Sequence, residues 1–356
     1  MRILSSLLSV FAFLALAGTV MADENPVSQP MFDQSVANFA RAEGETSDSP
    51  RISRAVEACP SGVLYFPAGV YEISEPIVVK NLCSLQLHKS AILRASEKMD
   101  FVLKVDTAQQ YQRERIAAGG AEDYNLFVVG GQIDGNGLAS CMSLDNYHHF
   151  TLRETTFLNG FPYGLRVDGA GHGYELIANN LYFKCVKSGL AGNTALFTTG
   201  GDSHYTDCVV VDYTVGFHVG GGSNRLTRCH VWGGPIPPAA PGEYPEMLKD
   251  SINYKIVGST AILRDCYADS GATGFYVDGY DVRLLGCSYF NNAHFKLDNI
   301  KIIQHVKGLL YVSEASFVKT VPHVLVYEGC GNVHWNNILY SGFGKDDECP
   351  GAIGKK

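Results

Sequence analysis

Tyr205-Thr-Asp-Cys208, Leu226-Thr-Arg-Cys229, Leu263-Arg-Asp-Cys266 and Leu284-Leu-Gly-Cys287 repeat one pattern within residues 202–290, the stretch that decides the fold. The cysteines are 21, 37 and 21 residues apart (229−208, 266−229 and 287−266), so the middle interval holds 16 additional residues. A unit this short has no core of its own and must stack on its neighbours to bury its apolar face. The repeat therefore predicts a solenoid.

A second repeated pattern predicts the strand that returns in each unit. Gly164-Leu-Arg-Val-Asp-Gly169, Gly216-Phe-His-Val-Gly-Gly221 and Gly274-Phe-Tyr-Val-Asp-Gly279 alternate apolar and polar residues between glycines, which is typical of a short strand bounded by turns. Coils of about 21 residues hold two or three such strands. We therefore predict an all-β chain that forms a single-stranded right-handed parallel β-helix with a short N-terminal capping helix.

Three further segments resemble a known family. Gly62-Val-Leu-Tyr-Phe-Pro-Ala-Gly-Val-Tyr-Glu-Ile73, Ile133-Asp-Gly-Asn-Gly137 and Ser223-Asn-Arg-Leu-Thr-Arg-Cys-His-Val-Trp-Gly233 resemble the pectate-lyase superfamily, and the resemblance covers about residues 48–345. It implies a β-helix that acts on a polysaccharide. The Asn-Thr-Asp, Asp-Asp, Gly-His-Gly and Arg-Ile-Lys set of polygalacturonase-type hydrolases is not found, and Asp134 lies in a turn that is structural in that family.

The chain divides into four parts by composition. Residues 1–22 contain an apolar run that ends in small residues, which predicts a cleaved signal peptide and a secreted or periplasmic protein. This run is short for a membrane span, and no later segment approaches about 20 apolar residues. Residues 23–47 predict a linker or N-terminal arm, residues 48–348 the β-helix domain, and residues 349–356 a C-terminal tail.

Ser47-Asp-Ser-Pro50 predicts the start of the capping helix, with Ile52, Ala55, Val56 and Cys59 on one face. The open end of a β-helix has unpaired backbone and exposed core, which an amphipathic helix covers. A partner-binding helix is the alternative.

The ten cysteines are compatible with two interpretations because export permits disulfides. Equivalent residues of neighbouring coils lie about 4.8 Å apart, but their side chains point the same way and pair poorly. We therefore predict buried thiols for the repeated cysteines. Better disulfide candidates near the ends of the solenoid are Cys59 with Cys83 and Cys330 with Cys349. Neither Cys-x-x-Cys nor the histidine spacing of a zinc site occurs, so no metal site and no cofactor are predicted. A role for Ca²⁺ stays open, although no motif indicates it.

Composition narrows the class of partner. A net charge of −8 argues against nucleic acid, whereas an acidic sugar is compatible if the basic residues gather in one place. We expect a polysaccharide or oligosaccharide partner, and the oligomeric state stays open.

The alternation of inward and outward side chains along each strand predicts which residues could form a functional site. If Leu165 and Val167 are buried, Arg166 and Asp168 point outward, and the same alternation exposes the corresponding residues of other coils. The predicted stripe runs, in order, through Ser143, Arg166, Ala191, His218, Lys255 and Tyr276. A flanking column contains Asp145, Asp168, Asn193 and Asp278.

The stripe supports three hypotheses. In a lyase, His218, Lys255, Tyr276 and Arg166 abstract the proton beside a uronate carboxylate, donate a proton and neutralise charge. In a glycosidase, two carboxyl groups lie about 5 Å apart (retaining) or about 6.5–9.5 Å apart (inverting), and Asp145 and Asp168 are the candidates. A non-catalytic glycan-binding protein or scaffold is the third hypothesis, because function depends on the site and not on the fold.

The additional residues between Cys229 and Cys266 belong to a proline-rich segment, residues 233–250. Its closely spaced prolines make it stiff, which favours a wall beside the stripe. Glu243, Tyr244 and Glu246 are expected to reach over the stripe, and Trp232 offers a ring for sugar stacking or plain packing.

Overall fold

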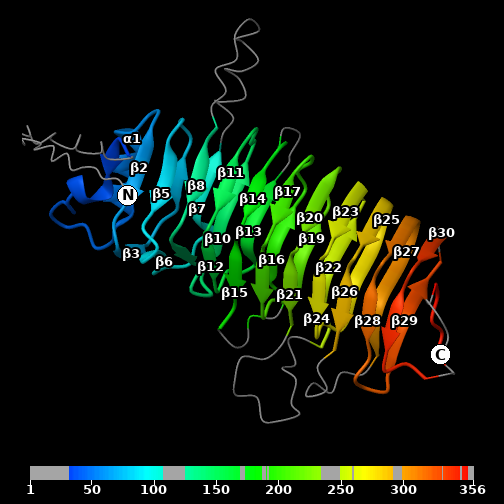
Figure 1. The fold of residues 1–356 in the computed structure, drawn as a ribbon. Helices are drawn as coiled ribbons and strands as arrows, with labels where there is room; N and C mark the ends of the chain where they lie inside the picture. The colour runs from blue at the N-terminus through cyan, green and yellow to red at the C-terminus, as the bar shows by residue number, and fades with distance from the viewer. Residues whose placement is uncertain are drawn as a thin grey trace, which may run out of the picture. The chain divides into compact units, whose positions relative to one another are not determined.

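Three ladders of short parallel strands wind around one apolar core in the computed structural model (Figure 1). The structure describes residues 32–106, 125–168, 173–186, 190, 192–233, 249–258, 260–291, 299–330, 332–344 and 347–351. Each coil contributes one strand to each ladder, and the coils follow one another in chain order. The predicted right-handed parallel β-helix is therefore confirmed.

Ladder 1 carries the predicted stripe on its outer face. It consists of β4 (Ile77–Val79), β7 (Phe101–Asp106), β10 (Ser140–Asp145), β13 (Tyr163–Asp168), β16 (Thr194–Thr198), β19 (Val215–Val219), β22 (Ile252–Val257), the first halves of β25 (Thr273–Leu285) and β27 (Ile300–Ser313), and β29 (Val324–Gly329).

Ladder 2 follows ladder 1 in each coil. It consists of β1 (Gln34–Ser35), β2 (Val63–Phe66), β5 (Ser84–Leu87), β8 (Phe127–Val129), β11 (Thr151–Arg153), β14 (Ile177–Asn179), β17 (His204–Thr206), β20 (Asn224–Thr227), β23 (Thr260–Arg264), the second halves of β25 and β27, and β30 (Asn332–Asn336). The long strands β25 and β27 pass through ladders 1 and 2 without a turn.

Ladder 3 completes the coil. It consists of β3 (Gly69–Ile73), β6 (Ala91–Ala95), β9 (Gln132–Asp134), β12 (Thr156–Leu158), β15 (Tyr182–Lys184), β18 (Val209–Val211), β21 (His230–Trp232), β24 (Tyr267–Asp269), β26 (Ser288–Phe290), β28 (Ser316–Val318) and β31 (Leu339–Ser341).

Inward residues of successive coils stack along the core. The rings of Phe217 and Tyr254 are stacked at 5.5 Å and those of Tyr254 and Phe275 at 5.2 Å, and all three residues are fully buried. The Tyr254 hydroxyl donates a hydrogen bond to the Cys229 carbonyl at 2.6 Å, which satisfies its polar atom. Truncating a buried aromatic of this kind costs about 3–5 kcal/mol, so this stack fixes the register of ladder 1.

A two-residue corner joins ladder 2 to ladder 3 in every coil from β8 onward. Its first residue adopts a left-handed conformation, with φ of 55° at Asp207 and 52° at Arg228. Its second residue points inward, and Cys208, Cys229 and Cys266 are all fully buried there. The repeated cysteines are therefore stacked inward as predicted, and the structure places them in turns.

The thiols of these corners hydrogen-bond to the backbone. Cys287 Sγ donates to the Leu263 carbonyl of the preceding coil at 3.4 Å, and burial raises the pKa of this thiol. Neither disulfide candidate is formed, because Cys59 and Cys83 are buried thiols and Cys330 is an exposed thiol.

The capping helix is α1 (Ser49–Glu57), preceded by the 3₁₀ helix η1 (Val36–Asn38). Asp48 is the N-cap residue of α1 and receives ion pairs from Arg41 and Arg51 at 2.7 and 2.6 Å. Ile52, Ala55 and Val56 belong to the buried core, which confirms the predicted face. Strand β1 pairs with β2 and lies within the stretch that the sequence suggested as a linker or arm.

Residues 1–31, which contain the predicted signal peptide, lie outside the described residues. Within the described ranges, no helix combines the length and apolar character needed to cross a bilayer.

Candidate functional site

Three predicted site residues occupy consecutive rungs of ladder 1. His218 of β19 is the direct partner of Lys255 of β22, which in turn is the direct partner of Tyr276 of β25. Each of these strands buries the residues on either side of the site residue, so parity turns all three side chains outward. The predicted order of these neighbours is confirmed, at a spacing of about 4.8 Å.

The rung before His218 differs from the prediction. Phe197 of β16 lies between Arg166 and His218, whereas Ala191 was expected there and lies outside the described residues. The strand begins at Thr194 because Leu196 is the residue that stacks inward between Leu165 and Phe217.

Asn193 is likewise absent from the flanking column. It is fully buried before β16, and its Oδ1 accepts a hydrogen bond from the Thr214 backbone at 2.9 Å. Its side-chain amide therefore stabilises the turn that precedes β19.

His218 is half-buried against an aromatic ring and a cation. Its imidazole meets the Phe197 ring edge-on at 4.8 Å, and Lys255 occupies the next rung. Burial and, to a smaller extent, the charge of Lys255 lower the pKa of His218 to about 4. The repulsion expected from Lys255 is present, but desolvation is the larger cause. His218 is thus a neutral proton acceptor at neutral pH.

The rungs after His218 carry a cation, a phenol and an ion pair. Lys255 Nζ lies 5.9 Å from the centre of the Tyr276 ring. Asp278, two residues further along β25, pairs with Lys307 Nζ at 3.1 Å. Tyr276 is half-buried, so its phenol group is held beside Lys255 and is open to a ligand on this face.

The other end of the stripe is a tight charge cluster around Asp145. Lys104 Nζ and Arg166 Nη2 lie 3.1 and 3.4 Å from its carboxylate oxygens, and Ser143 Oγ donates to it at 3.0 Å. The side chain of Asp145 is only 12% exposed. Asp168 is the direct strand partner of Asp145, as predicted. Because Asp145 neutralises two cations, it holds Arg166 in place.

The structure describes only the two ends of the proline-rich segment, residues 233–250, that was expected to form a wall beside the stripe. Glu243, Tyr244 and Glu246 fall in residues 234–248, which lie outside the described residues. Trp232 belongs to β21 of ladder 3, where Val231 points inward and Trp232 outward. It therefore lies on a different sheet from His218, because the sequence 230–232 forms the strand that precedes the segment.

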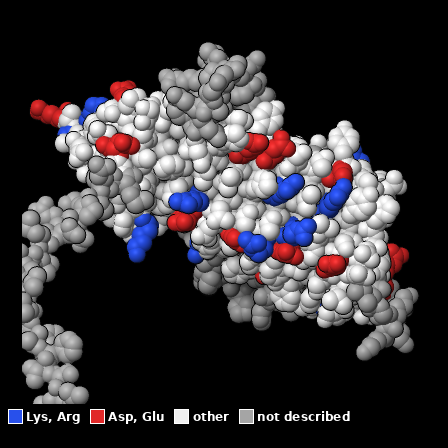
Figure 2. Space-filling view, turned by 45° about the horizontal axis from the view of Figure 1, so that its top comes forward, with Lys and Arg blue, Asp and Glu red and all other residues white. Residues whose placement is uncertain are grey.

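Basic and acidic side chains are interspersed on the face shown in Figure 2. The stripe has the same mixed character, since the column that contains Lys104, Arg166 and Lys255 runs beside the flanking column of carboxylates. Such a surface suits a ligand with both charged and hydroxyl groups better than a uniformly charged polymer.

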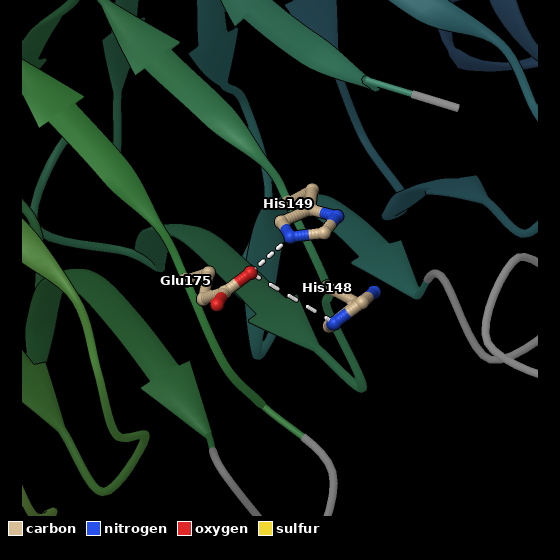
Figure 3. Close-up of side chains that lie close together, drawn as sticks. All are labelled: His148, His149 and Glu175. Carbon is tan, nitrogen blue, oxygen red and sulfur yellow. Dashed lines mark ion pairs between the residues drawn. The ribbon is translucent and has the colours of Figure 1, made fainter. Parts of the chain in front are cut away.

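A second cluster lies at the corner between ladders 1 and 2, where the sequence predicted no site. His149 Nε2 forms an ion pair with Glu175 Oε2, and His148 Nε2 lies 3.9 Å from the same oxygen (Figure 3). The two imidazole rings are 4.1 Å apart. This turn cluster, His148, His149 and Glu175, is partly exposed.

The turn cluster opens into a groove on the outer face of ladder 2. The groove has a volume of about 790 Å³, within the usual range for ligand sites, and its lining includes His149 and Glu175. Asp202, His204 and Arg225 of the following coils also line it.

The sequence contained one signal for this cluster, the adjacent His148 and His149. Glu175 is the residue that stacks on His149, because Ile177 pairs with Thr151. That correspondence was not visible in the sequence, since the coil containing it is longer than the repeat of about 21 residues.

Comparisons with known proteins identify the fold. No protein-family model and no curated protein matches the chain. A mutant tailspike protein of E. coli bacteriophage HK620, in complex with a pentasaccharide, is similar with a TM-score of 0.59 and 13% identity over 86% of this chain. ORF18 of Geobacillus virus E2 is similar with a TM-score of 0.57 and 14% identity over 85% of this chain.

The chain spans 66% of that tailspike and 62% of that ORF18 protein. PfbA, a surface adhesin of Streptococcus pneumoniae, is similar with a TM-score of 0.50 and 13% identity over 88% of this chain and 93% of the adhesin. At these identities the likeness shows the fold alone, a parallel β-helix.

Proposed function

We propose that the protein is an exported carbohydrate-active enzyme that cleaves a uronate-containing polysaccharide by β-elimination at the stripe. The observation that carries this proposal is His218, whose pKa of about 4 leaves a neutral imidazole in direct register with Lys255 and Tyr276. A general base must be unprotonated at the working pH, and a general acid must reach the departing oxygen of the bond that breaks.

The three rungs supply the parts of an elimination. His218 takes the proton beside the uronate carboxylate, and the electron pair left behind forms the carbon–carbon double bond as the glycosidic oxygen departs. Tyr276 donates a proton to that oxygen. Lys255, between the two, stabilises the negative charge that develops on the carboxylate.

Arg166 has a different task because it lies on the opposite side of His218 from Lys255 and Tyr276. It lies two rungs from His218, about 10 Å away, with Phe197 between them. At that distance it contacts another part of the polysaccharide chain, such as a neighbouring uronate. Asp145 orients its guanidinium, and the sugar ring meets Phe197.

Hydrolysis is the second candidate. Asp145 and Asp168 are direct partners on adjacent strands, which matches the separation of about 5 Å in retaining glycosidases. Against this, the Asp145 carboxylate is already engaged by Lys104, Arg166 and Ser143.

Binding without cleavage is the third candidate. It is supported by the pentasaccharide in the tailspike structure and by the description of PfbA as an adhesin. Export rests on the composition of residues 1–22.

One assay separates the three candidates. The protein is incubated with uronate-containing and neutral polysaccharides, and absorbance near 235 nm and reducing ends are followed. Elimination produces both signals, hydrolysis produces reducing ends alone, and a binding protein retains the polysaccharide without either. Asp145→Asn and Asp168→Asn are the hydrolysis controls: if they abolish cleavage while His218→Ala retains it, elimination is wrong.

A further inference from the structure

The turn cluster is built by the backbone of three stacked turns. His149, Glu175 and Asp202 each adopt a left-handed conformation, with φ of 49°, 62° and 50°. Glu175 N donates to the Gly201 carbonyl and Ile177 N to the Phe150 carbonyl, so each turn is fixed to the next coil. The corner places the side chains of His149 and Glu175 on top of each other before any ligand binds.

The core behind the cluster keeps this corner rigid. Tyr147 is fully buried, and its hydroxyl hydrogen-bonds to Ser203 Oγ at 3.1 Å, two coils further along. Phe150, directly after His149, is also buried. A site on such a supported corner retains its geometry better than one on a free loop.

The donor atoms of the cluster converge. One nitrogen from each imidazole and one Glu175 oxygen lie within 4.8 Å of one another. Around a tetrahedral zinc ion such atoms stand roughly 3.3 Å apart, so closure requires only small side-chain rotations. The side chains are 29%, 41% and 48% exposed, which leaves them room to rotate.

His148 and His149 face the same carboxylate oxygen of Glu175. His148 Nε2 lies 3.9 Å from Glu175 Oε2, which is too long for a hydrogen bond. Two protonated imidazoles with ring centres 4.1 Å apart would repel each other. A metal cation between two neutral imidazoles and a carboxylate is compatible with all three orientations.

We propose that His148, His149 and Glu175 bind a divalent transition-metal ion of the zinc class. Two imidazoles and one carboxylate suit zinc and its neighbours, whereas Ca²⁺ requires six to eight oxygen ligands. Three protein ligands would leave a coordination position open, and two of them, His149 and Glu175, line the same groove as Asp202 and Arg225. The ion would take an oxygen donor of a ligand there. This proposal is independent of the stripe.

Direct binding tests the proposal. Tag-free protein is stripped with a chelator and titrated with Zn²⁺ by calorimetry, and with Co²⁺ followed by visible absorption. The wild type should bind one equivalent with micromolar or tighter affinity, and His149→Ala and Glu175→Gln should each weaken binding at least about 10-fold. Binding should also weaken in acid, because imidazole ligands must be deprotonated to bind a metal ion.

His204→Ala is the matched control, since His204 lines the same groove outside the cluster and should leave affinity unchanged. Circular dichroism of the metal-free variants checks that they fold. If His149→Ala does not fold, His148→Ala replaces it. Binding weaker than about 1 mM in the wild type, or equal loss in His204→Ala and His149→Ala, overturns the proposal. Loss confined to the three cluster residues supports it.

Discussion

The stripe on ladder 1 and the turn cluster differ in what positions their side chains. His218, Lys255 and Tyr276 sit in strands, where alternation fixes which residues face outward and pairing fixes their neighbours. His148, His149 and Glu175 lie at a corner. There the number of residues in the turn determines which side chains face outward and which residues become neighbours. Strand sites in a β-helix can therefore be recognised from a repeat, whereas corner sites need the turn geometry.

The two regions also differ electrostatically. In the stripe a histidine lies beside a lysine and is half-buried, which lowers its pKa to about 4. In the turn cluster two histidines meet a carboxylate at a partly exposed corner. The first environment favours a neutral proton acceptor and the second favours a cation ligand.

The largest expected effect is on catalysis at the stripe. His218→Ala and Lys255→Ala should each lower kcat about 100-fold or more, because they remove the base or the charge that stabilises the transition state. His334→Ala is the matched control, since this histidine also faces outward from a strand and stacks on Tyr311, far along ladder 2. Equal loss in both histidine variants would contradict the assignment.

Arg166 should show a smaller effect of a different kind. Because it lies beyond Phe197, on the side of His218 away from Lys255 and Tyr276, Arg166→Met should raise KM about 10-fold and change kcat little, as expected for lost binding away from the reacting bond. Steady-state kinetics on a long substrate measure both constants. A fall in kcat comparable to that of His218→Ala would move Arg166 into the reaction itself.

The pKa of His218 should appear in the pH dependence of stability. The unfolded imidazole has a pKa near 6.5 and the folded one about 4, so between these values the unfolded state binds more protons. The contribution of His218 to stability is thus fully present above about pH 6.5 and declines as pH falls to about 4. Melting temperatures measured at a series of pH values test this. Between about pH 4 and 6.5, the melting temperature of His218→Gln should depend less on pH than that of the wild type. Parallel plots for the two proteins would refute the buried neutral imidazole.

The smallest expected effect separates the two causes of the shift. Lys255→Met removes the cation but leaves the burial, which is the larger cause, so the pKa of His218 should rise and stay below 6.5. An NMR titration of the imidazole resonances measures it. A return to 6.5 would mean that charge, and not burial, dominates.

The sequence predicted the fold because the two-residue corner repeats in every coil from β8 onward. Cys208, Cys229 and Cys266 mark this corner, and it fixes the register of the strands on either side. The same reasoning correctly predicted Lys255 and Tyr276 as the rungs after His218. It was wrong one coil earlier, where it placed Ala191 at the position that Phe197 occupies. The turn before β16 is longer there, and only the inward packing of Leu196 reveals where the strand begins.

The constant corner also determines where the molecule can accept new sequence. Between ladders 3 and 1, consecutive strands are separated by as few as the three residues 212–214 or by the whole of residues 233–251. Between ladders 2 and 3, every corner from β8 onward holds two residues, and a third would push the inward Cys229 or Cys266 out of its column and break the stack in both directions. Guest peptides, affinity tags or grafted binding loops therefore belong at the corners of ladder 1, where they add recognition surface while the solenoid keeps its pitch.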